Sequence, residues 1–241
     1  MIDIKELFFL KYQRYVEGRI NRRNDGRLVL MFHQVTDQKE NWYNPQYTMS
    51  LKSFKDMIAW CEYNRYEIVS PEDILKLDGR KKILLTFDDV FREIYTEVFP
   101  YLQEKGYPFA MFPSVELMKI KEYITLEMLR KMSDYVGCYI GTHTISHCFL
   151  RKENLSRCKE EIINSKNILE DYLGKSVECM AYPYGTFYAV SKKDRKLAEE
   201  NYKYAFSTLQ ACVTKEVDRY FIPRINMNES NWKDNLEYYK K

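Results

Sequence analysis

The chain contains three histidines, and each lies in a short segment suited to chemistry. His33 ends an apolar run, and His143 and His147 enclose the tripeptide Thr-Ile-Ser. Another apolar run ends in two adjacent carboxylates, Asp88 and Asp89. Imidazole is the commonest metal ligand and the side chain that titrates closest to neutral pH. This set of residues could therefore serve metal binding and proton transfer, provided that the fold brings it together.

Two of the histidines have a spacing that allows them to share a cation. His143 and His147 are four residues apart, so on one helical turn or in a tight loop their rings can point the same way. Two histidines and one carboxylate make the three-ligand site of a catalytic metal, which keeps room for water and substrate. Asp88 or Asp89 would supply the carboxylate. The alternative is a structural or surface role for the histidine pair.

The adjacent carboxylates are expected to divide two tasks. Like charges in one place raise each other's pKa, so Asp88 and Asp89 cannot comfortably do the same work. A metal could hold one of them as an ionised ligand and leave the other free to act as a general base. The alternative is a structural Asp-Asp turn that caps a helix beginning near Phe91.

The elements that must position these residues follow an α/β pattern. Short apolar runs alternate with longer amphipathic stretches, as strands alternate with crossover helices in a parallel sheet. We expect strands at residues 28–32, 66–69, 82–87, 109–112, 139–142, 179–182, 204–208 and 220–222, and helices at 4–20, 50–64, from 70, 91–105, 155–173, 194–201 and from 232. No repeat or linker is visible, so one domain is the economical interpretation.

The candidate residues follow the expected strands. His33, Asp88 and His143 each stand near the carboxyl end of one strand, and Pro183 and Arg224 follow two others. Functional groups gather at this end in parallel α/β folds because the loops meet there. The sequence therefore predicts that these groups share one rim.

The composition fits one large domain and argues against some partners. The 241 residues carry 38 Lys and Arg against 35 Asp and Glu, a balance that speaks against nucleic acid. The 21 tyrosines suit either sugar stacking or ordinary packing.

The chain start lacks a signal-peptide pattern, no stretch approaches the ~18–20 apolar residues of a transmembrane span, and the six cysteines form no CxxC. We therefore expect a cytoplasmic protein with reduced thiols.

Residues 1–27 are expected to form a helical arm ahead of a catalytic domain at 28–241. Apolar and basic residues recur at roughly helical spacing over 4–20. One interpretation is peripheral contact with a membrane or a partner through a basic face. The other is a helix packed against the domain, which is favoured because Glu6 and Glu17 interrupt the positive face.

Together the motifs resemble the NodB-like polysaccharide deacetylases of carbohydrate esterase family 4. The family's three motifs correspond to Thr86-Phe-Asp-Asp89, His143-Thr-Ile-Ser-His147 and Tyr182-Pro-Tyr-Gly185. The resemblance covers roughly residues 28–226. It extends to the circularly permuted branch typified by poly-β-1,6-N-acetylglucosamine deacetylases, whose opening strand ends in histidine, as Leu30-Met-Phe-His33 does. It implies a distorted (β/α)7-type barrel in a single domain.

The resemblance also implies a role for each matched residue. Asp88 would be the general base and His33 the general acid. One divalent transition metal would be bound by Asp89, His143 and His147, with zinc favoured and iron, cobalt or nickel as alternatives. The substrate and its oxyanion would meet Tyr182, Pro183 and Tyr184, the oxyanion through a backbone N–H near Tyr184.

The chain departs from the family pattern at two positions. Ala181 precedes Tyr182 where the family usually has an arginine that orients the base, and Arg224 is the expected substitute. The alternative for Arg224 is a simple surface ion pair. Val90 stands where the branch usually has glycine, and we expect it to narrow the mouth of the site.

The sequence thus predicts a metal-dependent hydrolase that removes N-acetyl groups from an amino-sugar polysaccharide or a glycan precursor. The alternatives are an O-acetyl esterase or amidase acting on a small glycan precursor, and a non-catalytic carbohydrate-binding relic. We expect loops 34–49 and 112–124 to shape the substrate groove. The aromatic rings expected to stack against a sugar are those of Trp42, Tyr43 and Tyr47. The alternative for these residues is a role in the core or in a lid.

Overall fold

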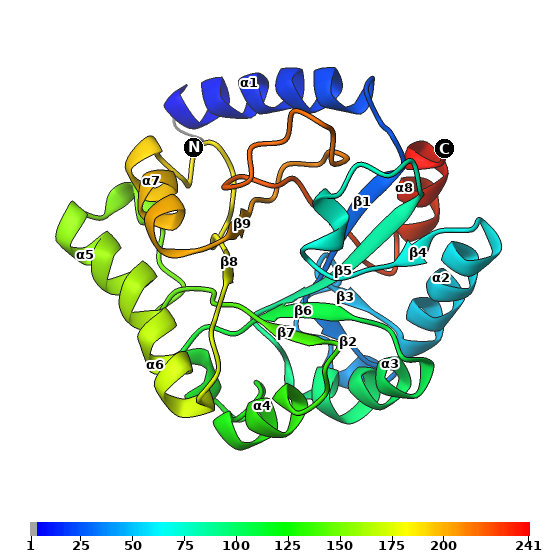
Figure 1. The fold of residues 1–241 in the computed structure, drawn as a ribbon, viewed down its shortest axis with the longest axis horizontal. Coiled ribbons are helices and arrows are strands. Elements are labelled where there is room, and N and C mark those ends of the chain that lie inside the picture. Colours follow the sequence, from blue (N-terminus) through cyan, green and yellow to red (C-terminus); the bar gives the residue numbers. More distant parts are fainter. Residues whose placement is uncertain (1–3) are drawn as a thin grey trace.

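A ring of parallel strands surrounded by helices forms the centre of the computed structural model, which describes residues 4–241 (Figure 1). The first three residues of the expected arm lie outside the described residues. The ring consists of β1 (Arg27–Phe32), β5 (Lys82–Asp88), β6 (Phe109–Phe112), β7 (Cys138–Ile140), β8 (Cys179–Ala181), β9 (Tyr204–Phe206) and β10 (Ile225–Asn226). The expected α/β class is confirmed.

Irregular closure explains why this barrel is distorted. One sheet has the order β10-β1-β5-β6-β7, and β8 pairs with β9 in another. Two isolated parallel bridges, Thr142 to Met180 and Phe206 to Ile222, connect the sheets. The seven strands therefore close into a ring that fits the expected (β/α)7-type barrel.

The longest strands, β1 and β5, are buried along their whole length. They pair in parallel from Arg27 with Lys82 to Phe32 with Phe87. Because both faces of such a strand are covered, residues 28–32 and 83–85 are continuous apolar runs without alternation. The rings of Phe32 and Phe87 stack with centroids 5.4 Å apart.

The remaining elements surround the ring (Figure 1). The helices are α1 (Ile4–Asn21), α2 (Leu51–Tyr63), α3 (Phe99–Lys105), α4 (Leu126–Ser133), α5 (Leu155–Lys159), α6 (Ser165–Leu173), α7 (Lys192–Asn201) and α8 (Trp232–Tyr239). Short strands are β2 (Gln34–Val35), β3 (Thr48–Met49) and β4 (Glu67–Ile68). Ser50 caps α2 by accepting a hydrogen bond from the Ser53 N–H, and Gly106 and Gly174 end α3 and α6 in the left-handed conformation, as expected.

Two expectations about the elements were wrong, and one helix was missed. The helix expected from Ser70 is only a 3-10 turn, Asp73–Leu75. The strand expected at 220–222 contributes one bridge, and β10 begins three residues later, after Pro223. Helix α4 was not expected, although Thr125 caps it and Leu129 and Met132 provide its buried face.

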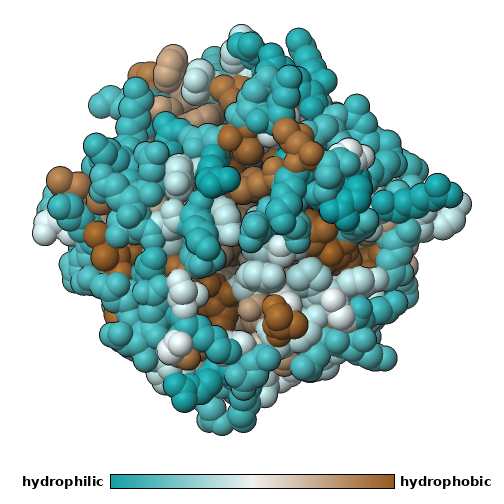
Figure 2. All heavy atoms as spheres, in the orientation of Figure 1, coloured by the Kyte–Doolittle hydropathy of each residue, from teal (hydrophilic) through white to brown (hydrophobic). Residues whose placement is uncertain are grey.

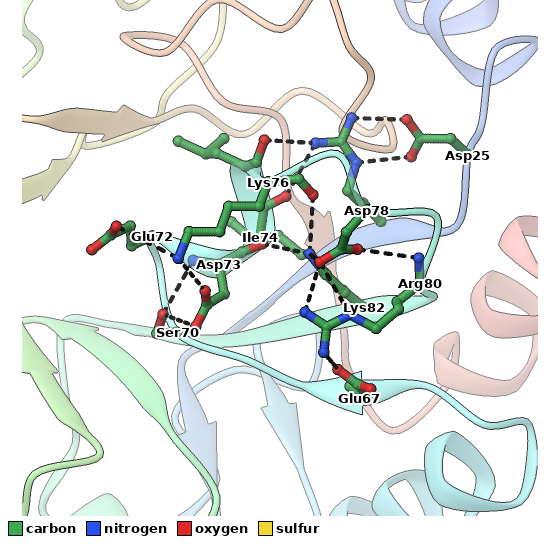
Figure 3. Close-up of polar contacts among 12 residues, drawn as sticks. Asp25, Glu67, Ser70, Glu72, Asp73, Ile74, Lys76, Asp78, Arg80 and Lys82 are labelled. Atoms are coloured by element: carbon green, nitrogen blue, oxygen red, sulfur yellow. Dashed lines mark hydrogen bonds and ion pairs between the residues drawn. The ribbon is translucent and has the colours of Figure 1, made fainter.

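A buried cationic network closes the amino ends of β1 and β5 (Figure 3). Lys82 is fully buried, and its Nζ donates to the carbonyl oxygens of Asp73 and Lys76, both at 3.0 Å, and to Asp78 at 2.6 Å. Arg27 donates to two more carbonyls of the same turn. Two buried cations thus donate to the carbonyls of the turn after Ser70, which ends after one 3-10 turn.

Replacing Lys82 with methionine should destabilise the fold by about 3 kcal/mol, because two carbonyls and Asp78 lose their buried donor. Urea unfolding of the purified variant measures this loss. The matched control is Lys76→Met, which removes an exposed lysine from surface ion pairs and should cost below about 0.5 kcal/mol. Equal stability of the two variants would show that the buried network contributes little.

Candidate active site

A cavity of about 730 Å³ lies where the strands end, and most of the sequence-predicted site residues line it. Those residues are His33, Asp88, Asp89, His143, His147 and Tyr184. Asp88 is the last residue of β5, and His33 directly follows β1. Parallel strands thus deliver side chains that are far apart in sequence to one place.

Asp89, His143 and His147 form a cluster that could hold a metal ion. Their candidate ligand atoms all lie within 4.8 Å of one another. Asp89 Oδ1 lies 3.9 Å from His143 Nε2 and 3.4 Å from His147 Nε2. Asp89 and His147 both have a left-handed backbone, with φ of 58° and 54°. Such strained residues persist where the surrounding structure holds them, often at functional sites.

The chemistry of these three residues fits a divalent cation. Asp89 Oδ1 is buried without a hydrogen-bond partner. Burial raises the pKa of Asp89 to about 6, so this carboxylate lacks a sufficient counter-charge. His143 Nδ1 lies 2.8 Å from the carbonyl of Ala181, which fixes the ring so that Nε2 is free to bind. Burial also lowers the pKa of His143 to about 3, which keeps it in the neutral, ligating form.

Asp88 is held by Arg224 from behind the cavity. The guanidinium donates two parallel hydrogen bonds to the carboxylate, both of 2.6 Å, and a third to the carbonyl of Ser207 at 2.8 Å. Both side chains are buried, so the pair is not the surface ion pair of the alternative interpretation. Arg224 occupies the position expected for a substitute of the missing family arginine.

The Arg224 guanidinium determines the charge state of Asp88. Burial alone would raise the pKa of this carboxyl, but Arg224 and His143 outweigh it and lower the pKa to about 2. Asp88 is therefore ionised near neutral pH, whereas Asp89 is the carboxyl that needs a cation. The two adjacent aspartates therefore lie in different electrostatic environments.

His33 lies at the same cavity but outside the cluster of candidate ligands. Its Nδ1 is buried without a hydrogen-bond partner, and its ring lies 4.8 Å from that of Tyr47. Burial lowers the pKa of His33, while Asp88 and Asp89 oppose this shift. His33 thus lines the cavity with one ring nitrogen that has no hydrogen-bond partner.

The third motif reaches the cavity through one residue. Tyr184 is half exposed, lines the cavity with φ of 61°, and accepts a hydrogen bond from Thr208 Oγ1 at its carbonyl. Tyr182 and Pro183 are buried and do not line the cavity, and the Tyr182 hydroxyl donates to the carbonyl of Tyr220. A Cβ on Gly185 would lie 2.6 Å from the Thr208 nitrogen, so the turn requires glycine.

Val90 does not narrow the mouth of the cavity, and this expectation was wrong. Its side chain is completely buried in the core and is not among the residues that line the cavity. The reason is the backbone: Val90 has φ of 56°, and its N–H donates to the carbonyl of Asp88. This turn directs the valine inward while Asp89 faces the cavity.

Aromatic residues form much of the cavity wall. Tyr43 and Tyr47 come from loop 34–49, and Tyr123 from loop 112–124, as expected. Trp42 does not line the cavity, since its Nε1 donates to the carbonyl of Thr36 instead. The sequence interpretation missed Phe149 and Tyr188, which also line the wall.

Helix α1 forms another part of the wall that the sequence did not reveal. Glu6, Leu10 and Gln13 line the cavity. The helix is held there because Glu17 accepts a hydrogen bond from the Gln210 N–H and Asn21 accepts one from the Cys212 N–H.

No helix within residues 4–241 is long and apolar enough to cross a membrane.

The comparisons with known proteins identify the family. The profile described as polysaccharide deacetylase matches residues 76–205, more than half of the chain. The chain therefore belongs to the polysaccharide deacetylase family, and the resemblance to the NodB-like enzymes is confirmed.

Relatives and solved structures agree with this family. The poly-β-1,6-N-acetyl-D-glucosamine N-deacetylase of Staphylococcus aureus is 25% identical over 244 residues, which cover 88% of this chain and 82% of the relative. The Streptococcus pyogenes deacetylase PplD, solved in complex with acetate, has a TM-score of 0.77 at 20% identity, covering 89% of this chain and 97% of that one. IcaB from Ammonifex degensii has a TM-score of 0.78 at 20% identity, covering 91% and 99%. At these identities the structures support the fold.

Proposed function

We propose that the chain is a metal-dependent carbohydrate N-deacetylase that hydrolyses the acetamide of an amino-sugar polymer or glycan precursor. The observation that carries this proposal is that one cavity holds two carboxylates with different surroundings. Asp88 is kept ionised by Arg224, and Asp89 Oδ1 lies without a hydrogen-bond partner beside His143 and His147. A base next to a cation site is what amide hydrolysis by water requires.

Each residue then has a defined task. A cation held by Asp89, His143 and His147 would polarise the amide carbonyl and lower the pKa of water. Asp88 takes the proton from the attacking water, and the backbone N–H of Tyr184 stabilises the oxyanion. His33 gives a proton to the amine nitrogen as the C–N bond breaks, which leaves acetate and a free amine.

The aromatic wall supports a sugar substrate. Tyr43, Tyr123 and Tyr184 surround the polar centre, and aromatic rings pack well against the apolar faces of sugars. The name of the Staphylococcus aureus relative indicates a polymer of β-1,6-linked N-acetylglucosamine, which we propose as the substrate class. The small-precursor esterase remains the second candidate, because the cavity alone favours neither amide nor ester.

Acetate release from a panel of substrates tests the function. The panel contains β-1,6-linked N-acetylglucosamine oligomers, lipid-linked N-acetylated precursors and O-acetylated sugars, each assayed with Zn²⁺, Fe²⁺, Co²⁺ and Ni²⁺. We expect metal-dependent release from an N-acetylated oligomer. Release from O-acetylated sugars alone would support the esterase, and sugar binding without release in any arm would support the carbohydrate-binding relic.

Replacing His143 with alanine should remove the metal. We expect the purified wild type to carry about one equivalent of a divalent metal, as one three-ligand site implies, and His143→Ala to lose it. Elemental analysis after dialysis measures the content. His33→Ala is the matched control, because it removes a cavity histidine that is not a ligand and should stop turnover with the metal retained. An unchanged metal content in His143→Ala would refute the assignment.

We also infer that α1 provides peripheral contact with an anionic membrane surface. Both acidic residues of the helix turn inward: Glu6 lines the cavity, and Glu17 binds Gln210. The outward side exposes apolar and basic side chains, namely Ile4, Leu7, Phe8, Lys11, Arg14, Tyr15 and Arg19. Figure 2 shows apolar patches among polar ones at the top, where α1 lies. Glu6 and Glu17, which favoured the interpretation of a helix packed against the domain, therefore do not interrupt the outward side of α1.

Vesicle flotation tests this contact. We expect the chain to float with vesicles that contain phosphatidylglycerol and not with phosphatidylcholine alone, and salt to weaken the binding. The double variant Lys11→Glu with Arg14→Glu should lose it. Lys192→Glu with Lys196→Glu, on α7, is the charge-matched control. Binding that the α1 variant retains would contradict the inference.

A further inference from the structure

Glu161 is a buried carboxylate outside the cavity that the proposed chemistry does not use. Its side chain has no exposed surface, although it lies between α5 and α6 near the outside of the barrel. Burial of a charge is costly unless the charge is paired and hydrogen-bonded. The contacts of Glu161 therefore indicate what this residue maintains.

Glu161 binds the segment between the two histidines. One oxygen accepts hydrogen bonds from the N–H groups of Ile145, at 2.8 Å, and Ser146, at 2.9 Å. The other accepts the Ser146 hydroxyl at 2.7 Å and pairs with Arg157 at 2.6 Å. All the polar contacts of this carboxylate except the arginine thus come from the short loop that leads into His147.

The same loop is held from its other side by the segment after β6. The Ser114 hydroxyl and the Glu116 N–H both donate to the carbonyl of Ile145, at 2.8 and 2.9 Å. The peptide at Ile145 is therefore fixed at both its N–H and its carbonyl. Thr144 and His147, which flank it, have left-handed backbones with φ of 65° and 54°. A left-handed backbone at a residue other than glycine is strained and persists only where the surrounding structure holds it.

The two histidines depend on this loop to different degrees. His143 has its own supports, since its ring binds the carbonyl of Ala181 and its N–H binds that of Pro113. His147 follows Ser146 directly, so its position relative to Asp89 depends on where the loop is held. A helix with π geometry, Glu160–Asn164, carries Glu161 to the loop, and such turns frequently occur near functional sites.

We propose that Glu161 is a positioning residue that places His147 for metal binding. The proposal rests on the proposed metal site. Groups that support metal ligands from behind typically change metal affinity by about 10- to 100-fold when they are lost. We therefore expect Glu161→Gln to weaken Zn²⁺ binding by about this factor while the protein remains folded.

Competition of the folded protein with a Zn²⁺ chelator measures the effect, and thermal unfolding in excess chelator monitors the metal-free fold. Glu160→Gln is the matched control, because it removes the same charge from an exposed neighbour that pairs with the same Arg157. Ser146→Ala removes one contact without burying a new group and should weaken Zn²⁺ binding several-fold. It provides the test if Glu161→Gln does not fold.

A double-mutant cycle separates positioning from general stability. In a His147→Ala background, Glu161→Gln should have no further effect on Zn²⁺ affinity, because the ligand that it positions is gone. A lower unfolding temperature with unchanged Zn²⁺ affinity, an equal effect of Glu160→Gln, or full additivity with His147→Ala would each overturn the proposal. A wild type that binds no Zn²⁺ would overturn both this proposal and the metal site.

Discussion

Asp88→Asn is expected to abolish acetate release while the metal stays bound. Asparagine has nearly the same shape as aspartate, but its amide cannot take a proton from water. Loss of a general base typically costs about 10²–10⁴-fold in rate. One amide oxygen can still accept a hydrogen bond from Arg224, so we expect a folded protein. Acetate release and metal content, measured on the same preparation, test both parts.

The neighbouring residue supplies the control for Asp88. Asp89→Asn makes the same chemical change one position later, but it replaces an unpartnered candidate ligand. We expect this variant to lose metal, and with it activity. If Asp88→Asn keeps wild-type activity, Asp88 is structural. If both variants lose metal equally, the division into a base and a ligand is wrong.

The location of the site could be predicted because parallel strands turn sequence order into spatial neighbourhood. His33 and Asp88 lie at the ends of β1 and β5, which pair along their full length. Each ends a continuous apolar run, a pattern that a single sequence displays directly. His143 and His147 were recognisable as a pair from their spacing. To predict that these residues lie together, only the ends of the strands had to be placed correctly.

Other parts of the site depend on tertiary contacts that no local pattern displays. Glu6 and Gln13 look like ordinary polar residues of a helix, and they reach the cavity only because α1 packs across loops near residue 210. Glu161 resembles its exposed neighbour Glu160, and its burial appears only when the loop after His143 folds against it.

Arg224 shows that a residue can be predicted although its element is not. The strand expected before it proved to be a single bridge, and β10 begins after it. The prediction of its partner came from the family resemblance, in which an arginine orients the base, and from the match between a guanidinium and a carboxylate, which does not depend on the register of the strand. Conversely, Tyr182 and Pro183 belong to a matched motif but are buried. We attribute their part in the motif to the backbone turn that presents Tyr184.

Arg224→Met should destabilise the metal-free protein by about 3–5 kcal/mol at neutral pH, because it leaves the carboxylate of Asp88 buried without its cation. The size of the loss should depend on pH. In the wild type the pKa of Asp88 is lowered to about 2, so its contribution to stability is present above the unfolded pKa and is lost as the pH falls toward 2. Without Arg224, burial raises this pKa above its unfolded value.

In the variant the sign is therefore reversed: Asp88 is tolerated when protonated and becomes destabilising as the pH rises. The difference in unfolding free energy between wild type and Arg224→Met should be smaller near about pH 4, where Asp88 of the variant is protonated, than near about pH 7. Urea unfolding in excess chelator at both pH values measures it. Adding Asp88→Asn to Arg224→Met removes the unpaired charge and should restore part of the stability at neutral pH. A loss that is independent of pH and insensitive to Asp88→Asn would mean that Arg224 acts through packing between Phe112 and Phe206, whose ring centroids lie 5.6 and 5.9 Å from its guanidinium.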